Sequence, residues 1–82
     1  MNIVRLKISG LKNLKHKLLK EAFNFPDYYG CNLDALYDCL GDLPVTGVLL
    51  TQDALPDSFC ESVIQVLEDS KKIKLIIKTA AY

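Results

Sequence analysis

The chain has 82 residues, of which 50% are hydrophobic and 24% are charged, and its formal net charge is zero. This length predicts one small domain over residues 1–82 with a single core of modest stability. No apolar run has the roughly 20 residues that a membrane-spanning helix needs. Arg5 and Lys7 also interrupt the apolar N-terminal stretch, so we expect a cytoplasmic protein without a signal peptide or membrane contact.

The charges are segregated along the chain, although they sum to zero. All ten acidic residues lie between Glu21 and Asp69, and all ten basic residues lie at positions 5–20 and 71–78. A chain of this kind can fold into one acidic and one basic face, each of which steers a partner of opposite charge. The alternative is that the charged residues form ordinary solvated faces without a partner.

Cys31, Cys39 and Cys60 lie in apolar, periodic segments, which predicts reduced and mostly buried thiols.

The first third of the chain predicts a strand followed by a helix. Residues 2–8 alternate between apolar and polar side chains, which is typical of a strand with one wet face that ends at Ser9 and Gly10. Asn13 can cap a helix over residues 14–23, and Pro26 prevents its continuation. The apolar stripe of this helix is expected at Leu14, Leu18 and Ala22.

The rest of the chain predicts a loop and four further elements. Tyr28, Tyr29 and Gly30 form the loop, and at least one of the two tyrosines is expected in the core. Asn32 can cap a short helix over residues 33–40 that Gly41 ends. The continuous apolar run at 45–51 indicates a central strand, which a loop or one helical turn follows at 53–56.

The last two elements are a helix and a strand. Ser58 and Glu61 fit a capping box that opens a helix to about Lys72, with Lys71 and Lys72 near its C-terminal end. Its apolar stripe is expected at Phe59, Val63, Val66 and Leu67. Residues 73–79 predict a third strand.

The order of these elements predicts an α/β fold. Strands that helices separate favour parallel pairing with right-handed crossovers. We therefore predict a small two-layer domain in which a three-stranded parallel sheet packs against three to four helices. Lysines on the first and last strands suit edge positions, where charge discourages aggregation.

The short helix at 33–42 carries the clearest functional signal. Leu33, Leu36 and Leu40 fall on one side, with Cys39 at its margin, and this side should pack on the core. The opposite side should face solvent or a partner, and Asp34, Tyr37, Asp38 and Gly41 lie there, with Asp42 at its margin. Like charges one turn apart destabilise a helix by about 0.2–0.5 kcal/mol. The helix dipole also disfavours Asp38 near the C-terminal end, so we infer a role for it beyond helix stability.

The segment FPDYYGCNLDALYDCL at 25–40 resembles the signature of the barstar family, the small intracellular inhibitors of microbial ribonucleases. The resemblance extends over nearly the whole chain, because ESVIQVLEDS at 61–70 and IKLIIK at 73–78 resemble the family's last helix and last strand. It implies a three-stranded parallel sheet with packed helices. The segment between the second strand and the last helix is short, so one family helix is reduced or missing.

The resemblance also implies a mechanism in which the loop and the acidic helix plug the active site of a ribonuclease. By this resemblance the Asp38 carboxylate takes the place of an RNA phosphate and accepts charge-assisted bonds from the enzyme's arginines and histidine. Asp34 matches a second acidic contact, and Gly30 and Asn32 match residues that shape and cap the loop. With Asp42 from the margin of the helix face, the expected partner-binding residues are Tyr28, Gly30, Asn32, Asp34, Tyr37, Asp38, Asp42 and Asp69.

Three departures from the family pattern leave the identity of the ribonuclease open. Tyr37 stands where the family often has tryptophan, Asp69 is one methylene shorter than the family's glutamate, and Cys31 occupies a position that is commonly acidic. The second hypothesis keeps the fold and changes the partner to a different basic protein or toxin. Competition with an RNA-like ligand distinguishes the two.

Other functional classes fit the sequence less well. Asp34 and Asp38 would need a cleft to act as an acid–base pair, and His16 is expected to be a solvated residue of a lysine-rich helix, so we predict no enzyme. The cysteines show no zinc spacing, and no glycine-rich phosphate loop follows a strand, so no metal or cofactor is expected. The lysines of the first helix are interpreted as a solvated face and not as a direct nucleic-acid site. We expect a monomer, although nothing in the sequence excludes self-association.

Overall fold

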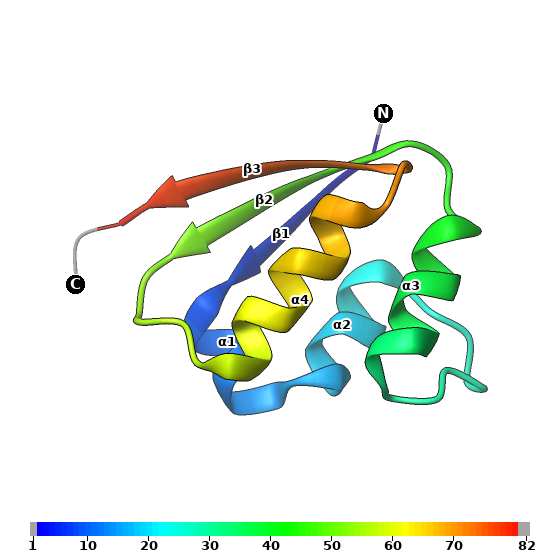
Figure 1. Cartoon of the computed structure of the whole chain (residues 1–82), viewed down its shortest axis with the longest axis horizontal. Helices are drawn as coiled ribbons and strands as arrows, with labels where there is room; N and C mark the ends of the chain where they lie inside the picture. Colours follow the sequence, from blue (N-terminus) through cyan, green and yellow to red (C-terminus); the bar gives the residue numbers. More distant parts are fainter. Residues whose placement is uncertain (1, 81–82) are drawn as a thin grey trace.

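The computed structural model of the chain describes residues 2–80, and Figure 1 shows a twisted sheet with the helices along one side. The elements in chain order are β1 (Asn2–Lys7), α1 (Ile8–Leu14), α2 (His16–Phe23), α3 (Leu33–Gly41), β2 (Thr46–Gln52), α4 (Ser58–Asp69) and β3 (Ile73–Thr79). The three strands are all parallel, and β2 lies between β1 and β3. The predicted two-layer α/β fold and the central position of the second strand are therefore confirmed. No helix within residues 2–80 is long and apolar enough to cross a membrane.

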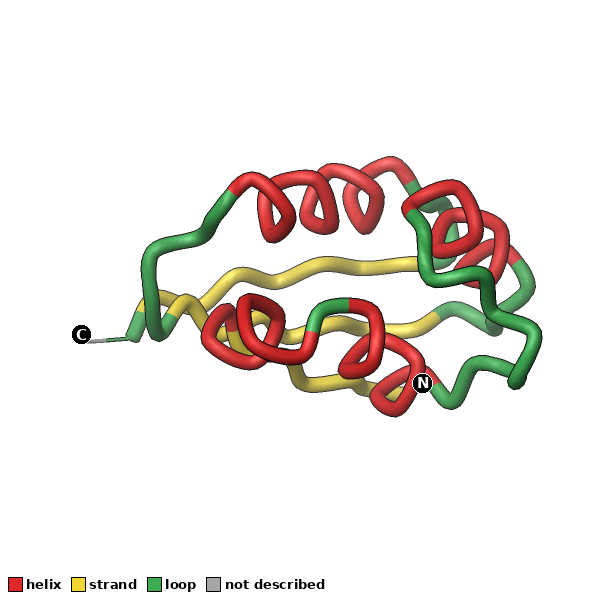
Figure 2. The backbone as a smooth tube through the Cα atoms, turned by 90° about the horizontal axis from the view of Figure 1, so that it is seen from below, coloured by secondary structure: helices red, strands yellow, loops and turns green. Residues whose placement is uncertain are grey.

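The register of the strands assigns each side chain to one face of the sheet. Side chains alternate between the two faces, so each row across the strands belongs to a single face. The rows that face the helices are Val4–Val48–Leu75 and Leu6–Leu50–Ile77, and the rows on the opposite face are Ile3–Gly47–Lys74, Arg5–Leu49–Ile76 and Lys7–Thr51–Lys78. Figure 2 shows the helices from their own side, with the strands running alongside α4 and the α1–α2 segment.

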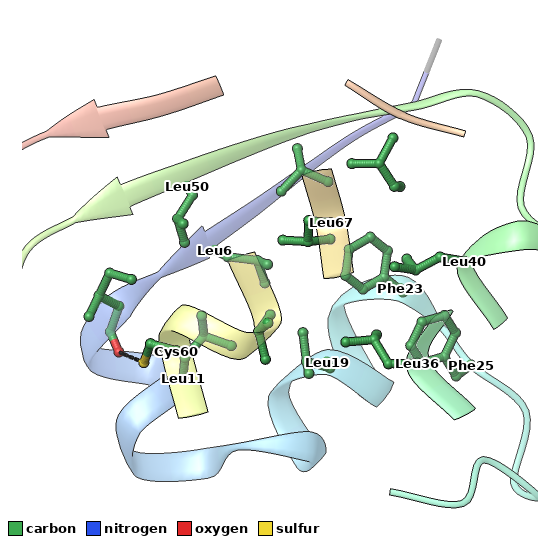
Figure 3. Packing of buried hydrophobic residues seen from close by; sticks show 14 of the residues in the cluster. Leu6, Leu11, Leu19, Phe23, Phe25, Leu36, Leu40, Leu50, Cys60 and Leu67 are labelled. Carbon is green, nitrogen blue, oxygen red and sulfur yellow. Dashed lines mark hydrogen bonds between the residues drawn. The ribbon is translucent and has the colours of Figure 1, made fainter. Parts of the chain in front are cut away.

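The core lies between the sheet and the helices, as Figure 3 shows. Leu6 and Leu50 of the sheet pack in one cluster with Leu19 of α2 and Leu67 of α4, and all four are almost completely buried. Each such leucine stabilises the fold by roughly 1.5–3 kcal/mol through burial. The same cluster includes the leucine side of α3, which is thereby fixed at one end of the molecule.

The helix that follows β1 differs from the prediction. It begins at Ile8, directly after the strand, and Asn13 lies inside it instead of capping a later helix. Lys15 interrupts the helix with φ 51° and ψ −127°, and α2 then begins at His16. Two short helices therefore replace the single predicted helix over residues 14–23.

Gly10 explains how these two helices pack closely. A Cβ atom at this position would lie 3.1 Å from the Leu18 Cδ2 atom, so a larger residue would require the Leu18 side chain to shift by a few tenths of an ångström. The predicted apolar stripe of this region is wrong at Leu14, whereas Leu18 and Ala22 are partly buried and pack against the core. Leu14 is 46% exposed, while Leu19 and Phe23 form the buried side of α2 and Leu18 is only partly buried.

A residue distant in sequence accepts the hydrogen bonds that the first turn of α1 donates. The Ser9 N–H donates to Asp53 Oδ1 at 3.0 Å, and the Ser9 hydroxyl donates to Asp53 Oδ2 at 2.7 Å. No side chain next to α1 in the sequence caps its N-terminus. These two hydrogen bonds lower the pKa of the Asp53 carboxyl. The carboxylate that follows β2 thus stabilises the helix that follows β1.

The boundaries of α4 also differ from the prediction. The cap is Asp57, whose carboxylate accepts a hydrogen bond from the Cys60 N–H at 2.9 Å, and Ser58 is already helical. The helix ends at Asp69, so Lys71 and Lys72 belong to the turn that leads into β3. The buried part of the predicted apolar stripe is confirmed at Val63 and Leu67, whereas Phe59 and Val66 are partly buried.

Candidate functional site

The start of α3 is built as predicted. The Asn32 side-chain oxygen accepts a hydrogen bond from the Ala35 N–H at 2.7 Å, and its Nδ2 donates to the Gly30 carbonyl at 3.3 Å. A Cβ atom at Gly30 would lie 3.2 Å from Asn32 Nδ2, so the glycine leaves room for the capping amide. Loop and helix are therefore held to one another by a local network, which fixes the direction in which α3 leaves the loop.

Tyr29 ties the same loop to the core. Its hydroxyl lies 2.7 Å from His16 Nδ1, and its ring packs against Phe25 with centroids 4.9 Å apart. Burial raises the pKa of Tyr29 to about 12, with smaller contributions from the thiols of Cys31 and Cys39. The prediction that one of the two loop tyrosines enters the core is confirmed for Tyr29.

The other loop residues face outward. Tyr28 is 83% exposed, and its ring is available for contact. Asp27 forms an ion pair with Lys20 at 3.3 Å, which contributes little because both groups are solvated. Cys31 is exposed in a left-handed conformation with φ 52°, so the prediction of a buried thiol is wrong at this position.

The other two cysteines behave more nearly as predicted. Cys60 is fully buried, and Cys39 is partly buried at the margin of the leucine side of α3. Burial raises the pKa of the Cys39 thiol, and the neighbouring Asp42 and Asp38 raise it further. This thiol therefore stays protonated and unreactive at neutral pH.

The outward side of α3 carries the charged residues that the pattern placed there. Asp34, Tyr37, Asp38 and Asp42 are exposed, and Leu36 and Leu40 on the opposite side are fully buried. The sole ion pair within residues 2–80 joins Lys20 to Asp27, so none of the α3 carboxylates forms an ion pair within these residues. The carboxylates are therefore available to the cations of a partner.

Asp34 and Asp38 share a wide, open hollow of about 730 Å³ beside α3. Asn32 and Cys31 border it on the loop side, and His16 and Phe59 border it on the side of α2 and α4. The His16 and Phe59 rings pack edge to face with centroids 5.1 Å apart. An aromatic wall thus faces two carboxylates across a space that a cationic side chain of another protein can enter.

Tyr37 lies at a different hollow, of about 210 Å³, together with Gly41, Ser70, Lys71 and Lys72. Asp69 immediately precedes this turn at the end of α4, is exposed, and accepts a hydrogen bond from Gln65 Nε2 at 3.1 Å. Of the expected partner-binding residues, the structure therefore gathers Asn32, Asp34 and Asp38 at the larger hollow. Tyr37 lies at the smaller one, next to the end of α4.

The residues at these hollows that were not predicted as site residues include His16, Phe59, Lys71 and Lys72. His16 was expected to be solvated, but it is half-buried, and burial lowers its pKa. Phe59 was assigned to the core stripe, and Lys71 and Lys72 to the end of a helix. All four reach the site through tertiary packing, so no local signal in the sequence marks them.

The chemistry of the site is that of a binding surface. Within residues 2–80, no group of histidine, cysteine or acidic side chains could hold a metal ion. The one imidazole is engaged with the Tyr29 hydroxyl and not with either aspartate. The surface offers unpaired carboxylates, exposed tyrosines and a pre-formed loop, which are features of a protein-binding surface.

Fold and site together define a small α/β protein that presents an acidic helix beside a hydrogen-bonded loop. The sequence matches the family described as Barstar (barnase inhibitor) over residues 1–80, and the chain belongs to this family. It is also 41% identical over 63 residues to the "Putative ribonuclease inhibitor YrdF" of Bacillus subtilis (strain 168), a match that covers 70% of this chain and 69% of that protein.

Proposed function

We propose that this chain inhibits a small basic ribonuclease by occupying its active site with α3 and the preceding loop. Membership of the Barstar (barnase inhibitor) family and the name of the Bacillus subtilis relative support ribonuclease inhibition. The observation that carries the proposal is the pair of exposed carboxylates, Asp34 and Asp38, which border one hollow and have no cationic partner within residues 2–80. The chain acts as an inhibitor and carries out no chemistry itself.

Asp38 is the central group in this proposal. Its carboxylate replaces a phosphate of the RNA and accepts charge-assisted hydrogen bonds from the arginines and the histidine that would otherwise bind the substrate. Asp34 supplies a second negative charge in the same hollow. The exposed rings of Tyr28 and Tyr37 exclude water from the edge of the contact, and Asp42 and Asp69 add charge there.

The loop is prepared for binding before the partner arrives. The Asn32 cap fixes the first turn of α3, and the contact between Tyr29 and His16 fixes the loop against α2. A surface that is already ordered loses less conformational entropy on association, which strengthens binding without any additional contact. Gly30 contributes by leaving space for the cap.

The test is titration of barnase activity on an RNA substrate with the purified chain. We expect one molecule of the chain to inhibit one molecule of barnase. Excess RNA should relieve this inhibition, because inhibitor and substrate would compete for the active site. Asp38→Ala should weaken inhibition about 100-fold, because the partner's cations lose their carboxylate in a desolvated contact. Glu21→Ala is the matched control, since it removes one exposed negative charge from α2 and should change inhibition little.

Two results would contradict this proposal. One is an Asp38→Ala protein that is folded by circular dichroism and inhibits as well as the wild type. The other is binding that RNA does not relieve, which would assign the acidic surface to a different basic protein or toxin. A one-to-one complex by light scattering is expected for a monomeric inhibitor that protects the cell from the ribonuclease.

A further inference from the structure

The sheet has an uncovered face. Figure 1 shows the helices on one side of the strands and none on the other. Parallel sheets generally have both faces covered, because their strands are largely apolar. Here Ile3 is 66% exposed and Ile76 is 64% exposed, and Leu49 pairs with Ile76 in the row next to that of Ile3. The face therefore presents apolar side chains that no part of the described chain covers.

Cations flank these apolar residues on both edges of the sheet. Arg5 and Lys7 lie on β1, and Lys74 and Lys78 lie on β3, all exposed and all on the uncovered face. Two inter-strand spacings separate the two strands, a distance of roughly 10 Å. None of the three strands contains an acidic residue, and none of the four cations forms an ion pair within residues 2–80.

The central strand leaves a shallow trough between the two rows of cations. A hollow of about 260 Å³ lies over Gly47, between the apolar side chains of Ile3, Leu49 and Ile76, with Arg5 and Lys74 at its sides. The nearest carboxylate along β2 is Asp53, and Ser9 occupies both of its oxygens. Protection of the two edge strands from aggregation would explain the lysines. It would not explain why an apolar trough lies between the two rows of cations.

We propose that this face docks an amphipathic acidic helix of a partner protein, separately from the α3 surface. An α-helix with its side chains is about 10–12 Å wide, which matches the distance between the two rows of cations. Its apolar stripe would cover Ile3, Leu49 and Ile76. Aspartates and glutamates on both sides of the stripe would pair with the cations of β1 and β3 and complete the second layer on the sheet.

Other occupants fit this face less well. A second copy that met it symmetrically would bring four cations against four like charges. The acidic α3 of a second copy has no free apolar stripe, because Leu36 and Leu40 are buried in its own core. Single-stranded RNA binds platforms on which its bases stack on aromatic rings, and the three strands contain none.

The experiment uses the full chain and a fluorescein-labelled peptide of about five helical turns, with leucines along one side and glutamates on both flanks. Fluorescence anisotropy at low salt should show saturable binding of this peptide and no binding of a scrambled peptide of equal composition. Arg5→Glu with Lys74→Glu should weaken binding at least tenfold. The matched control, Lys12→Glu with Lys17→Glu, reverses two exposed charges on α1 and α2 and should leave binding unchanged.

Ile76→Gln tests the apolar contact without a change of charge and at an exposed site, where the fold tolerates it. It should weaken peptide binding, with a circular dichroism spectrum like that of the wild type. Asp38→Ala should bind the peptide normally, so this test is independent of ribonuclease inhibition. The proposal is overturned if the amphipathic peptide does not bind, or if the scrambled peptide binds as well as it does. It is also overturned if Lys12→Glu with Lys17→Glu weakens binding as much as Arg5→Glu with Lys74→Glu does, or if an oligouridylate of similar length binds more tightly than the peptide.

Discussion

The contact between His16 and Tyr29 connects the loop before α3 to the second helix. The imidazole lies 2.7 Å from the phenol and packs on the Phe59 ring, so it is partly removed from water. Desolvation disfavours the protonated form and lowers the pKa of His16. The unfolded chain therefore binds a proton at this site more readily than the folded chain does.

Stability should consequently fall as the pH decreases. The contribution of neutral His16 is complete above its unfolded pKa of about 6.5 and is lost as the pH falls from there toward the lower folded value. Urea unfolding between about pH 7.5 and 5.5 should show a falling midpoint for the wild type. His16→Gln should show a flatter profile, and an equally steep profile in this variant would assign the proton uptake to another group.

At the scale of single elements, α1 shows what a local pattern cannot reveal. The alternating pattern predicts that the first strand ends at Ser9 and Gly10, and serine and glycine are poor residues for a helix interior. Two contacts distant in sequence reverse that preference: the Asp53 carboxylate holds Ser9, and Leu18 packs closely over Gly10. By contrast, α3 was predicted almost residue by residue, because its cap and its leucine spacing are local.

Asp53→Asn tests the cap that reaches α1 from the end of β2. The amide keeps one acceptor oxygen and loses the other, so the variant should unfold at a lower temperature at neutral pH. Because the pKa of Asp53 is lowered in the fold, its stabilisation is present above the ordinary value of about 3.8 and is lost as the pH falls further. Wild type and variant should therefore converge in acid, as thermal melts at several pH values can show.

Ser9→Ala serves as the partner variant in a double-mutant cycle. It removes the hydroxyl donor and leaves the backbone donor in place. The effects of Ser9→Ala and Asp53→Asn should be less than additive, because both remove the same hydrogen bond. Strict additivity would show that the two residues act independently.

At the scale of the whole molecule, the acidic and basic residues that are segregated along the sequence also lie on separate surfaces. The carboxylates of α3 lie at one end of the molecule, and four cations cover the open face of the sheet. The topology and the acidic helix were predictable because they follow from hydrophobic periodicity and a contiguous motif. The positions of His16, Phe59, Lys71 and Lys72 at the two hollows were not, because packing between distant segments sets them.

This separation predicts salt-dependent association in a protein whose net charge is zero. The field at α3 should steer a basic ribonuclease toward it, and ions screen that field over about 10 Å at moderate salt. The association rate with barnase in stopped-flow fluorescence should fall at least tenfold between about 0.02 and 0.5 M NaCl. The dissociation rate should change much less, and a salt-independent association rate would show that the local field does not guide the encounter.

The strand order has a consequence for how the protein is made. The first strand, Asn2–Lys7, and the last, Ile73–Thr79, both pair with Thr46–Gln52. During synthesis the first strand must wait for a partner that lies about 40 residues further along the chain. The sheet closes only when residue 79 has left the ribosome. A translating chain thus cannot hold its acidic helix on a finished core until nearly all of these residues have been made.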